Sequence, residues 1–217
     1  MLRISSMAAV LTVLLVATDP AQAQVCKCID VGDIKARIKE AQTAVAAYST
    51  EMRKMAEQIQ RTQEPIPYTP ARRAKLQGHV QDALNQGAGG RISPTPHMGH
   101  GPGHTSNLCQ IVIDLHPSAT ACMRESVKRH EEHHSKECRK TLTAGRVADS
   151  VTSGKDRFER NNAQLMEYAM EEIAGYNTEI MFLQSELVRL DRSEECRPKP
   201  KPEVRDFTAQ PRDRKAR

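Results

Sequence analysis

The sequence has no tryptophan and few other aromatic residues, with three phenylalanines and four tyrosines among 217 residues. Aromatic side chains usually supply much of a compact core, so a globular core would be thin here. Downstream of residue 23 the chain also lacks any run of about twenty apolar residues, and no membrane-spanning helix is expected. We therefore expect a mainly α fold in which long antiparallel helices pack lengthwise, with at most a minimal strand element.

Residues 1–23 have the composition of a secretory signal peptide. Arg3 precedes an apolar run over residues 7–17, and the small residues Ala21 and Ala23 stand where a signal peptidase would read them. The apolar run is too short to cross a bilayer. The pattern predicts a mature protein that begins near residue 24 and is exported, to the periplasm or to the medium.

Six cysteines follow the predicted cleavage point. An even number of cysteines in an exported chain favours disulfide bonds over free thiols. Cys122 and Cys138 belong to one predicted helix and would lie about 24 Å apart along it, which excludes a bond between these two. The remaining connectivity stays open, but we expect disulfides to staple the helices together.

The formal net charge of +5 comes from the last residues of the chain. Residues 197–217 contain eight Lys and Arg against three Asp and Glu, so the preceding residues sum to zero. This proline-rich tail is expected to be disordered, either as a solubilising end or in electrostatic contact with anionic envelope material. Nucleic acid is not an expected partner, because the rest of the chain shows neither a basic face nor interleaved aromatics.

Helical periodicity begins early in the mature chain. From Ile34 to Ile59 apolar residues recur in steps of three and four, which predicts a long helix with a heptad seam. Asp33 is placed to cap this helix, and the prolines that follow should end it. A shorter helix is predicted over residues 70–85, with Thr69 as its N-cap.

The predicted domain covers residues 24–196. Its second half is expected to contain one loop, one strand and two helices. A loop rich in Gly, Pro and His is expected over residues 85–107, followed by a short strand within residues 108–115. Ser118 should cap the next helix, and an irregular connection follows it. The last helix is predicted over residues 157–192, with an apolar stripe that we expect to pack on the seam of the first helix.

The helix that follows Ser118 contains a motif with metal-ligand spacing. His130, Glu131 and His134 form H-E-x-x-H, and both histidines continue the apolar stripe of Met123 and Val127. Residues four apart on a helix have Cβ atoms about 5 to 6 Å apart, so both imidazoles can converge on one ion, for which Zn²⁺ is the expected metal. Glu131, rotated about 100° from His130, can then reach a water molecule on the ion and take its proton.

A catalytic zinc site normally has three protein ligands and one open position. The last helix offers Glu172, which lies beside the apolar stripe. Gly175 follows one turn later, where the missing side chain would let the histidine helix come close. Glu171 is the alternate ligand, because it also precedes a small residue, Ala174, by three positions.

These residues resemble the zinc metallopeptidases of the gluzincin type, in which a downstream Glu in an E-x-x-small pattern completes the H-E-x-x-H helix. Residues 172–175 read E-I-A-G, and Tyr176 continues the pattern as in small exported bacterial members. The resemblance implies hydrolysis of amide bonds in a peptide, protein or peptidoglycan substrate. It implies a zincin-like active-site helix with the metal ligands His130, His134 and Glu172 and the catalytic base Glu131.

Other interpretations stay open. Tyr176 could donate a hydrogen bond to the oxyanion of a tetrahedral intermediate, although its place on the stripe favours a core aromatic. His130 and His133 could hold a metal in place of the motif pair. The chain could also be an exported metal-binding or helical scaffold protein without catalysis, with a flexible chelating loop. The loop histidines are His97, His100 and His104.

Overall fold

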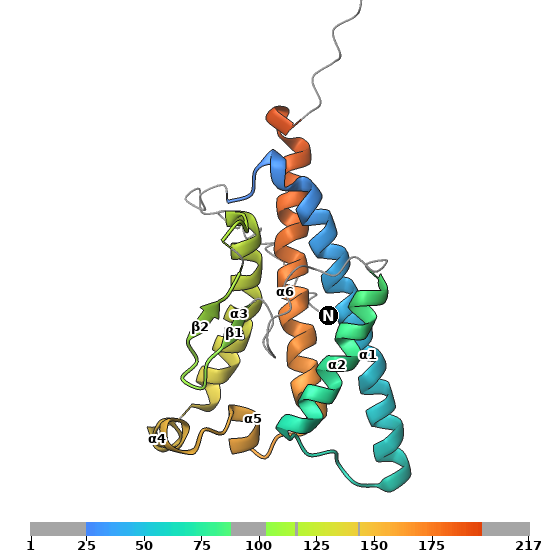
Figure 1. Ribbon diagram of the computed structural model, residues 1–217, viewed down its shortest axis with the longest axis vertical. Helices are drawn as coiled ribbons and strands as arrows, with labels where there is room; N and C mark the ends of the chain where they lie inside the picture. The colour runs from blue at the N-terminus through green and yellow to red at the C-terminus, as the bar shows by residue number, and fades with distance from the viewer. Residues whose placement is uncertain (1–24, 88–102, 116, 143, 197–217) are drawn as a thin grey trace, which may run out of the picture.

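The computed structural model describes residues 25–87, 103–115, 117–142 and 144–196, so the predicted signal peptide and basic tail lie outside it. The described chain is mainly helical, as predicted. Its two longest helices, α1 (Val31–Thr62) and α6 (Leu165–Arg192), run antiparallel along each other (Figure 1). The helix α3 (Ala121–Thr141) packs on α6 as well, so α6 lies between α1 and α3.

The seam of α1 faces α6, which confirms the predicted packing of the first helix on the last. Its buried apolar residues include one at every seventh position, namely Ile34, Ala41, Tyr48 and Met55. The predicted cap was wrong: Asp33 lies inside the helix because a 3-10 turn, η1 (Cys28–Asp30), leads directly into α1.

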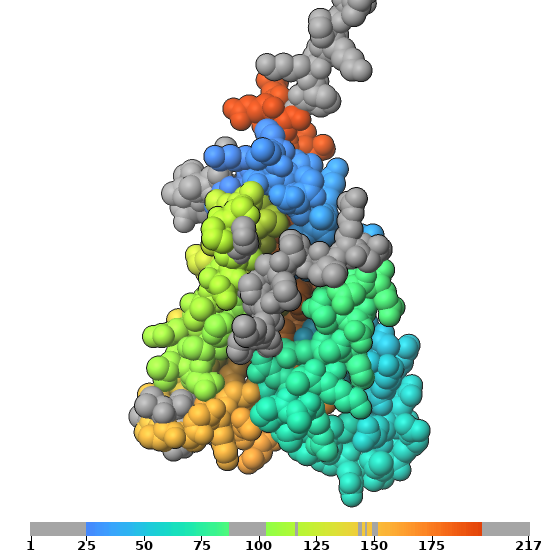
Figure 2. All heavy atoms as spheres, in the orientation of Figure 1, coloured from blue at the N-terminus to red at the C-terminus, as the bar shows by residue number. Residues whose placement is uncertain are grey.

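Helix α2 (Pro70–Gly87) begins where the sequence predicted and packs on α1. The Thr69 hydroxyl accepts a hydrogen bond from the Arg72 backbone N–H at 3.2 Å, which confirms Thr69 as a cap. Just before α2 the chain bonds to the start of α6, with the Leu165 N–H 2.9 Å from the Ile66 carbonyl. Figure 2 shows these two segments in contact at the lower end of the molecule.

A short antiparallel hairpin lies against α3. It consists of β1 (Gly103–Thr105) and β2 (Ile111–Ile113), with His104 opposite Val112. The predicted strand is confirmed at β2, but β1 was wrongly assigned to the loop over residues 85–107. A Gly-His-Thr sequence has turn composition, and its strand conformation comes from pairing with β2.

Two boundaries in the second half differ from the prediction. The N-cap of α3 is Thr120, whose hydroxyl accepts from the Met123 N–H at 3.3 Å, and not Ser118. The predicted irregular connection contains a helix, α4 (Ala144–Ser153), and the predicted last helix is broken into α5 (Arg157–Arg160) and α6. Asn162 has a φ of 50°, and this left-handed residue accounts for the break.

Three disulfides staple the helices, and they use all six cysteines. The bonds are Cys26–Cys122, Cys28–Cys196 and Cys109–Cys138. Disulfides of this number are typical of an oxidising compartment. Among the described helices, none combines the length and the apolar composition that a membrane-spanning segment requires.

The buried apolar side chains form two clusters, one toward each end of α6. The first is centred on Tyr48, Leu76, Leu165 and Tyr168. The second contains Ile34, Cys122, Leu183 and Leu190. The stretch of α6 between the clusters, residues 172–179, carries two glutamates and faces the histidines of α3, so a layer of polar side chains separates two apolar cores.

Candidate metal centre

Helix α3 presents His130 and His134 to α6 because they lie one turn apart on its buried face. Both are 7% exposed, while Lys128 on the opposite side is solvent-exposed and pairs with Glu125 and Glu132 of the same helix. The outward charges stabilise the helix as i, i+3 and i, i+4 pairs. Both histidines continue the buried stripe of Val127, as the sequence predicted.

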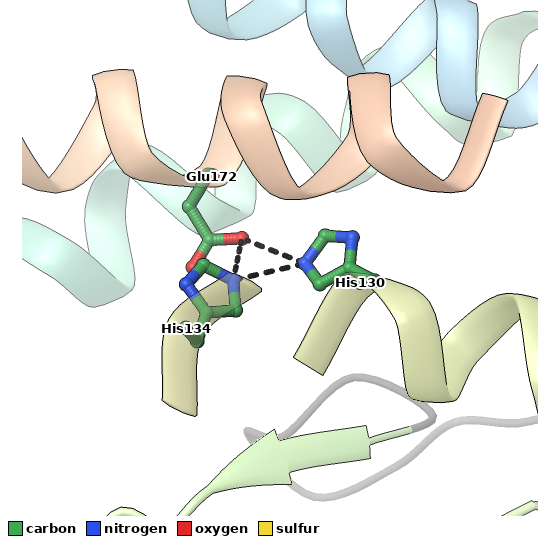
Figure 3. A group of neighbouring side chains, drawn as sticks. All are labelled: His130, His134 and Glu172. Atoms are coloured by element: carbon green, nitrogen blue, oxygen red, sulfur yellow. Dashed lines mark hydrogen bonds and ion pairs between the residues drawn. The ribbon is translucent and has the colours of Figure 1, made fainter. Parts of the chain in front are cut away.

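Helix α6 brings Glu172 to the same point. Its Oε2 atom lies 3.7 Å from Nε2 of His130 and 3.8 Å from Nε2 of His134, and the two Nε2 atoms are 3.0 Å apart. Figure 3 shows the carboxylate above both imidazole rings, with the three donor atoms pointing toward one another. His130, His134 and Glu172 thus form a group that could hold a metal ion, with all donor atoms within 4.8 Å of one another.

The spacing of these three atoms fits a tetrahedral zinc ion. Bonds of about 2.0 to 2.1 Å at tetrahedral angles place neighbouring donor atoms about 3.3 Å apart. The two imidazole nitrogens are slightly closer than this and the carboxylate oxygen slightly farther. Adjustments of a few tenths of an ångström would complete the geometry, and two imidazoles with one carboxylate are a common catalytic donor set for zinc.

Gly175 allows the two helices to approach at this point. A Cβ atom added there would lie 2.9 Å from Nε2 of His130 and 3.0 Å from its Cε1. The imidazole therefore occupies the space that any other residue would fill. The predicted role of the missing side chain is confirmed by this contact.

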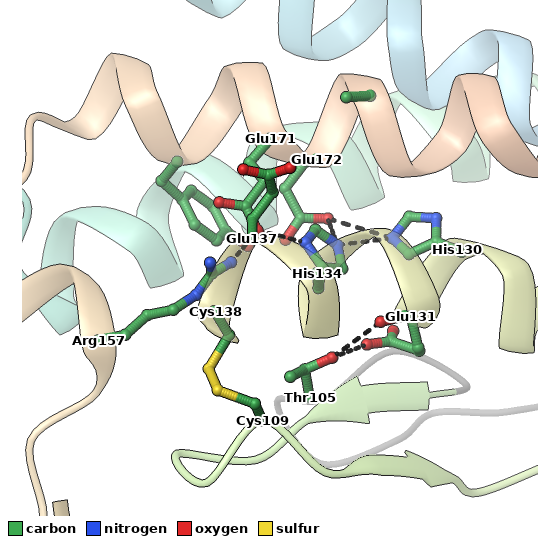
Figure 4. A network of polar contacts seen from close by, with 12 residues as sticks. Thr105, Cys109, His130, Glu131, His134, Glu137, Cys138, Arg157, Glu171 and Glu172 are labelled. Carbon is green, nitrogen blue, oxygen red and sulfur yellow. Dashed lines mark hydrogen bonds and ion pairs between the residues drawn. A yellow bond between two sulfur atoms is a disulfide. The ribbon is translucent and has the colours of Figure 1, made fainter. Parts of the chain in front are cut away.

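Each histidine has a further carboxylate on its other nitrogen. Nδ1 of His134 lies 2.8 Å from Oε1 of Glu171, which also pairs with Arg157, and Nδ1 of His130 lies 3.7 Å from Oε2 of Glu179. Figure 4 shows Glu171 on the outer side of the His134 ring. A carboxylate on the far nitrogen fixes the tautomer and orientation of a ligating histidine. Glu171, the alternate ligand in the sequence prediction, therefore supports His134 from outside the group.

The charges distribute protons unequally over the two imidazoles. Burial lowers the pKa of His130, but the carboxylates of Glu172 and Glu179 outweigh it and raise the pKa to about 9. Burial lowers the pKa of His134. The 3.0 Å contact between the two Nε2 atoms requires a proton on one of them and not on both. Burial opposes ionisation of Glu172, but His134 and His130 lower its pKa to about 2.

Glu131 lies on the same helix but points to the other side, toward the hairpin (Figure 4). Its side chain is in contact with β1, where the Thr105 hydroxyl lies 3.0 Å from Oε2, and a Cβ at Gly103 would lie 2.9 Å from Cγ of Glu131. Burial raises the pKa of this carboxyl. Glu131 is thus held near the motif histidines without belonging to the donor group.

The Tyr176 ring meets the His130 ring edge-on at 4.5 Å and packs against the first apolar cluster, which supports the core interpretation. His133 is half-buried and its ring lies 5.9 Å from that of His134, so His133 stays outside the donor group. His104 lies in β1, whereas His97 and His100 fall outside the described residues.

Sequence reasoning missed Glu179 and its partner. Glu179 is completely buried on α6, and Arg37 of α1 donates to its two oxygens at 2.7 and 3.0 Å. A signal was present, since Glu179 follows Glu172 by seven residues and Gly175 by four, which places all three on one helical face. Arg37 could not be identified because it is 142 residues away in sequence.

No family model, curated protein or solved structure matches this chain.

Proposed function

We propose that the protein is an exported zinc-dependent hydrolase, a metallopeptidase similar to the gluzincin type. The observation that carries the proposal is the convergence of His130, His134 and Glu172, from two helices, with Glu131 on the same helix and outside the ligand set. Zinc is the metal of choice for two imidazoles and one carboxylate with an open position. Export is supported by the three disulfides together with the signal-peptide pattern of residues 1–23.

The roles of the residues follow from their positions. A bound zinc ion would supply a Lewis acid that polarises a substrate carbonyl and lowers the pKa of water in the site to about 7. His130, His134 and Glu172 would hold the ion. Glu131, once its side chain turned from Thr105 toward the site, would accept a proton from the attacking water and pass it to the leaving amine. Burial raises the pKa of Glu131, which favours a carboxyl group that takes up and returns a proton.

The proposed substrates are amide bonds in peptides, proteins or peptidoglycan crosslinks. The basic residues 197–217 would bring the enzyme to anionic envelope material.

The proposal is tested with purified, disulfide-intact protein. Wild-type protein should contain one zinc per chain, and His134→Ala should lose it. Glu131→Gln should keep the zinc but lose about 10² to 10⁴ in rate against casein, peptide libraries or peptidoglycan, since the amide cannot accept the proton. Undiminished turnover in Glu131→Gln would refute the mechanism, and equal zinc in wild-type and His134→Ala protein would refute the site.

A non-catalytic metal-binding or scaffold protein is the second candidate. The observation that favours it is burial, because Glu131 is 5% exposed and both ligand histidines are 7% exposed beneath their neighbours. A substrate carbonyl would then need the hairpin to move. Zinc bound without turnover on any substrate would select this candidate. If the zinc content falls when His97, His100 and His104 are replaced together, but not when His134 is replaced, the metal is bound by those three histidines.

A further inference from the structure

Glu179 is a charged side chain with no exposure to solvent. It lies in the polar layer of α6, and its carboxylate accepts hydrogen bonds from three donors. Arg37 donates through Nε to Oε1 at 2.7 Å and through Nη2 to Oε2 at 3.0 Å, and the Ser126 hydroxyl donates to Oε1 at 3.0 Å. The bidentate contact with Arg37 fixes the plane of the carboxylate, so that Oε2 faces the His130 ring.

The His130 ring has a nitrogen that needs this carboxylate. Its buried Nδ1 forms no hydrogen bond within the described part of the chain, and Oε2 of Glu179 lies 3.7 Å away. An imidazole that binds a metal through Nε2 carries its proton on Nδ1, and a buried N–H without an acceptor is unfavourable. A movement of about 0.8 Å would bring Oε2 within hydrogen-bond distance of that N–H.

Fold stability alone gives a weak reason for this arrangement. A buried ion pair replaced by apolar side chains of similar volume often leaves a protein equally stable or more stable. Apolar side chains would also join the two apolar clusters that the polar layer now separates. The pair is therefore better explained by what it does to its neighbour than by its own contribution to folding.

We propose that Arg37 and Glu179 position His130 for metal binding. Helix α1 then contributes to the metal site through Arg37. Glu179 accepts the Nδ1 proton and holds the ring so that Nε2 points at the ion, and Arg37 holds Glu179. The inference rests on the proposed metal site and adds to it a positioning pair from outside the H-E-x-x-H motif. Helix α1 contributes no ligand to the group, yet its Arg37 would determine how tightly the group binds.

A double variant separates positioning from structural support. Removing one partner leaves an unpaired buried charge and can unfold the protein, whereas Arg37→Met with Glu179→Leu removes both charges and keeps the volume. The metal-free double variant should unfold near the wild-type temperature, yet bind zinc about 10- to 100-fold more weakly in competition with a chromogenic chelator. Leu183→Ala, which loosens the same helix one turn later, is the structural control and should keep wild-type zinc affinity.

A second readout uses Glu179→Gln, whose amide keeps the size and one acceptor oxygen of Glu179. We expect about tenfold weaker zinc binding. In ¹⁵N spectra of the zinc-loaded protein, the His130 Nδ1 signal should move in this variant, because the proton loses its anionic acceptor. Wild-type affinity in both the double variant and Glu179→Gln would overturn the positioning role. Wild-type protein that binds no zinc would refute the metal centre itself, a different result from failure of the positioning pair.

Discussion

Replacing Gly175 by alanine tests the packing that brings the two helices of the proposed metal site together. The new methyl carbon would lie 2.9 Å from Nε2 of His130, whereas such atoms normally approach to about 3.5 Å. The ring must therefore move by about 0.6 Å. It has little room to do so, because the Tyr176 ring packs edge-on against it at 4.5 Å and Glu179 faces its other nitrogen.

Two effects of the substitution oppose each other. Alanine in place of glycine inside a helix stabilises it by about 0.5 to 1 kcal/mol. Overpacking a filled site costs about 1 to 3 kcal/mol, so the steric effect should exceed the helical one and leave the protein about 1 kcal/mol less stable. A displacement of this size at a ligand should also weaken zinc binding by about 10-fold or more, since active geometry must be kept within about 0.5 Å.

Gly78 provides a matched control. It lies inside α2, and a Cβ at this position would meet nothing within 4 Å. Gly78→Ala should therefore gain the full helical benefit of about 0.5 to 1 kcal/mol and leave zinc binding unchanged. Denaturant unfolding of the metal-free proteins and zinc competition measure the two quantities. The reasoning would be refuted if Gly175→Ala gained stability as Gly78→Ala does, or bound zinc as tightly as the wild type.

Two further predictions concern pH and the hairpin. The pKa of His130 is raised from 6.5 to about 9 in the folded chain. Protonated His130 therefore stabilises the fold fully below pH 6.5, and this stabilisation is lost as pH rises through 9. Metal-free protein should lose about 3 kcal/mol of stability between pH 6.5 and 9, measured by thermal unfolding. Zinc affinity should rise with pH, because the ion displaces the proton of His130. A zinc affinity that does not depend on pH would contradict protonation of His130. Replacing Cys109 and Cys138 by serine should cost about 3.5 kcal/mol in denaturant unfolding, because their bond closes a loop with a sequence separation of 29. A cost below about 1 kcal/mol would show that the hairpin holds to α3 without the bond.

The helical part of the fold could be predicted because helical faces are determined by local spacing. The seven-residue recurrence that starts at Ile34 places the core of α1, and the four-residue spacing of His130 and His134 places both rings on one side of α3. Glu172 and Gly175 obey the same rule on α6. Each of these residues can be identified without knowledge of any distant contact.

Features that depend on long-range contacts were missed. The strand β1 has turn-like residues, and only its pairing with β2 makes it a strand. Arg37 looks like an ordinary surface cation in α1, and its role appears when α6 places Glu179 opposite it. Asn162 breaks the predicted last helix through a left-handed backbone, a conformation that asparagine tolerates but does not require.

The bond between Cys28 and Cys196 closes the chain into a covalent ring that contains every proposed ligand. A single backbone cut anywhere within this ring opens it but cannot separate the pieces. A protease that cut after Gly154, for example, would leave His130 and His134 on one fragment and Glu172 on the other, still joined through the disulfide. In the oxidising environment that its disulfides indicate, the protein would meet proteases, and nicked molecules built in this way would keep both parts of the proposed metal site together.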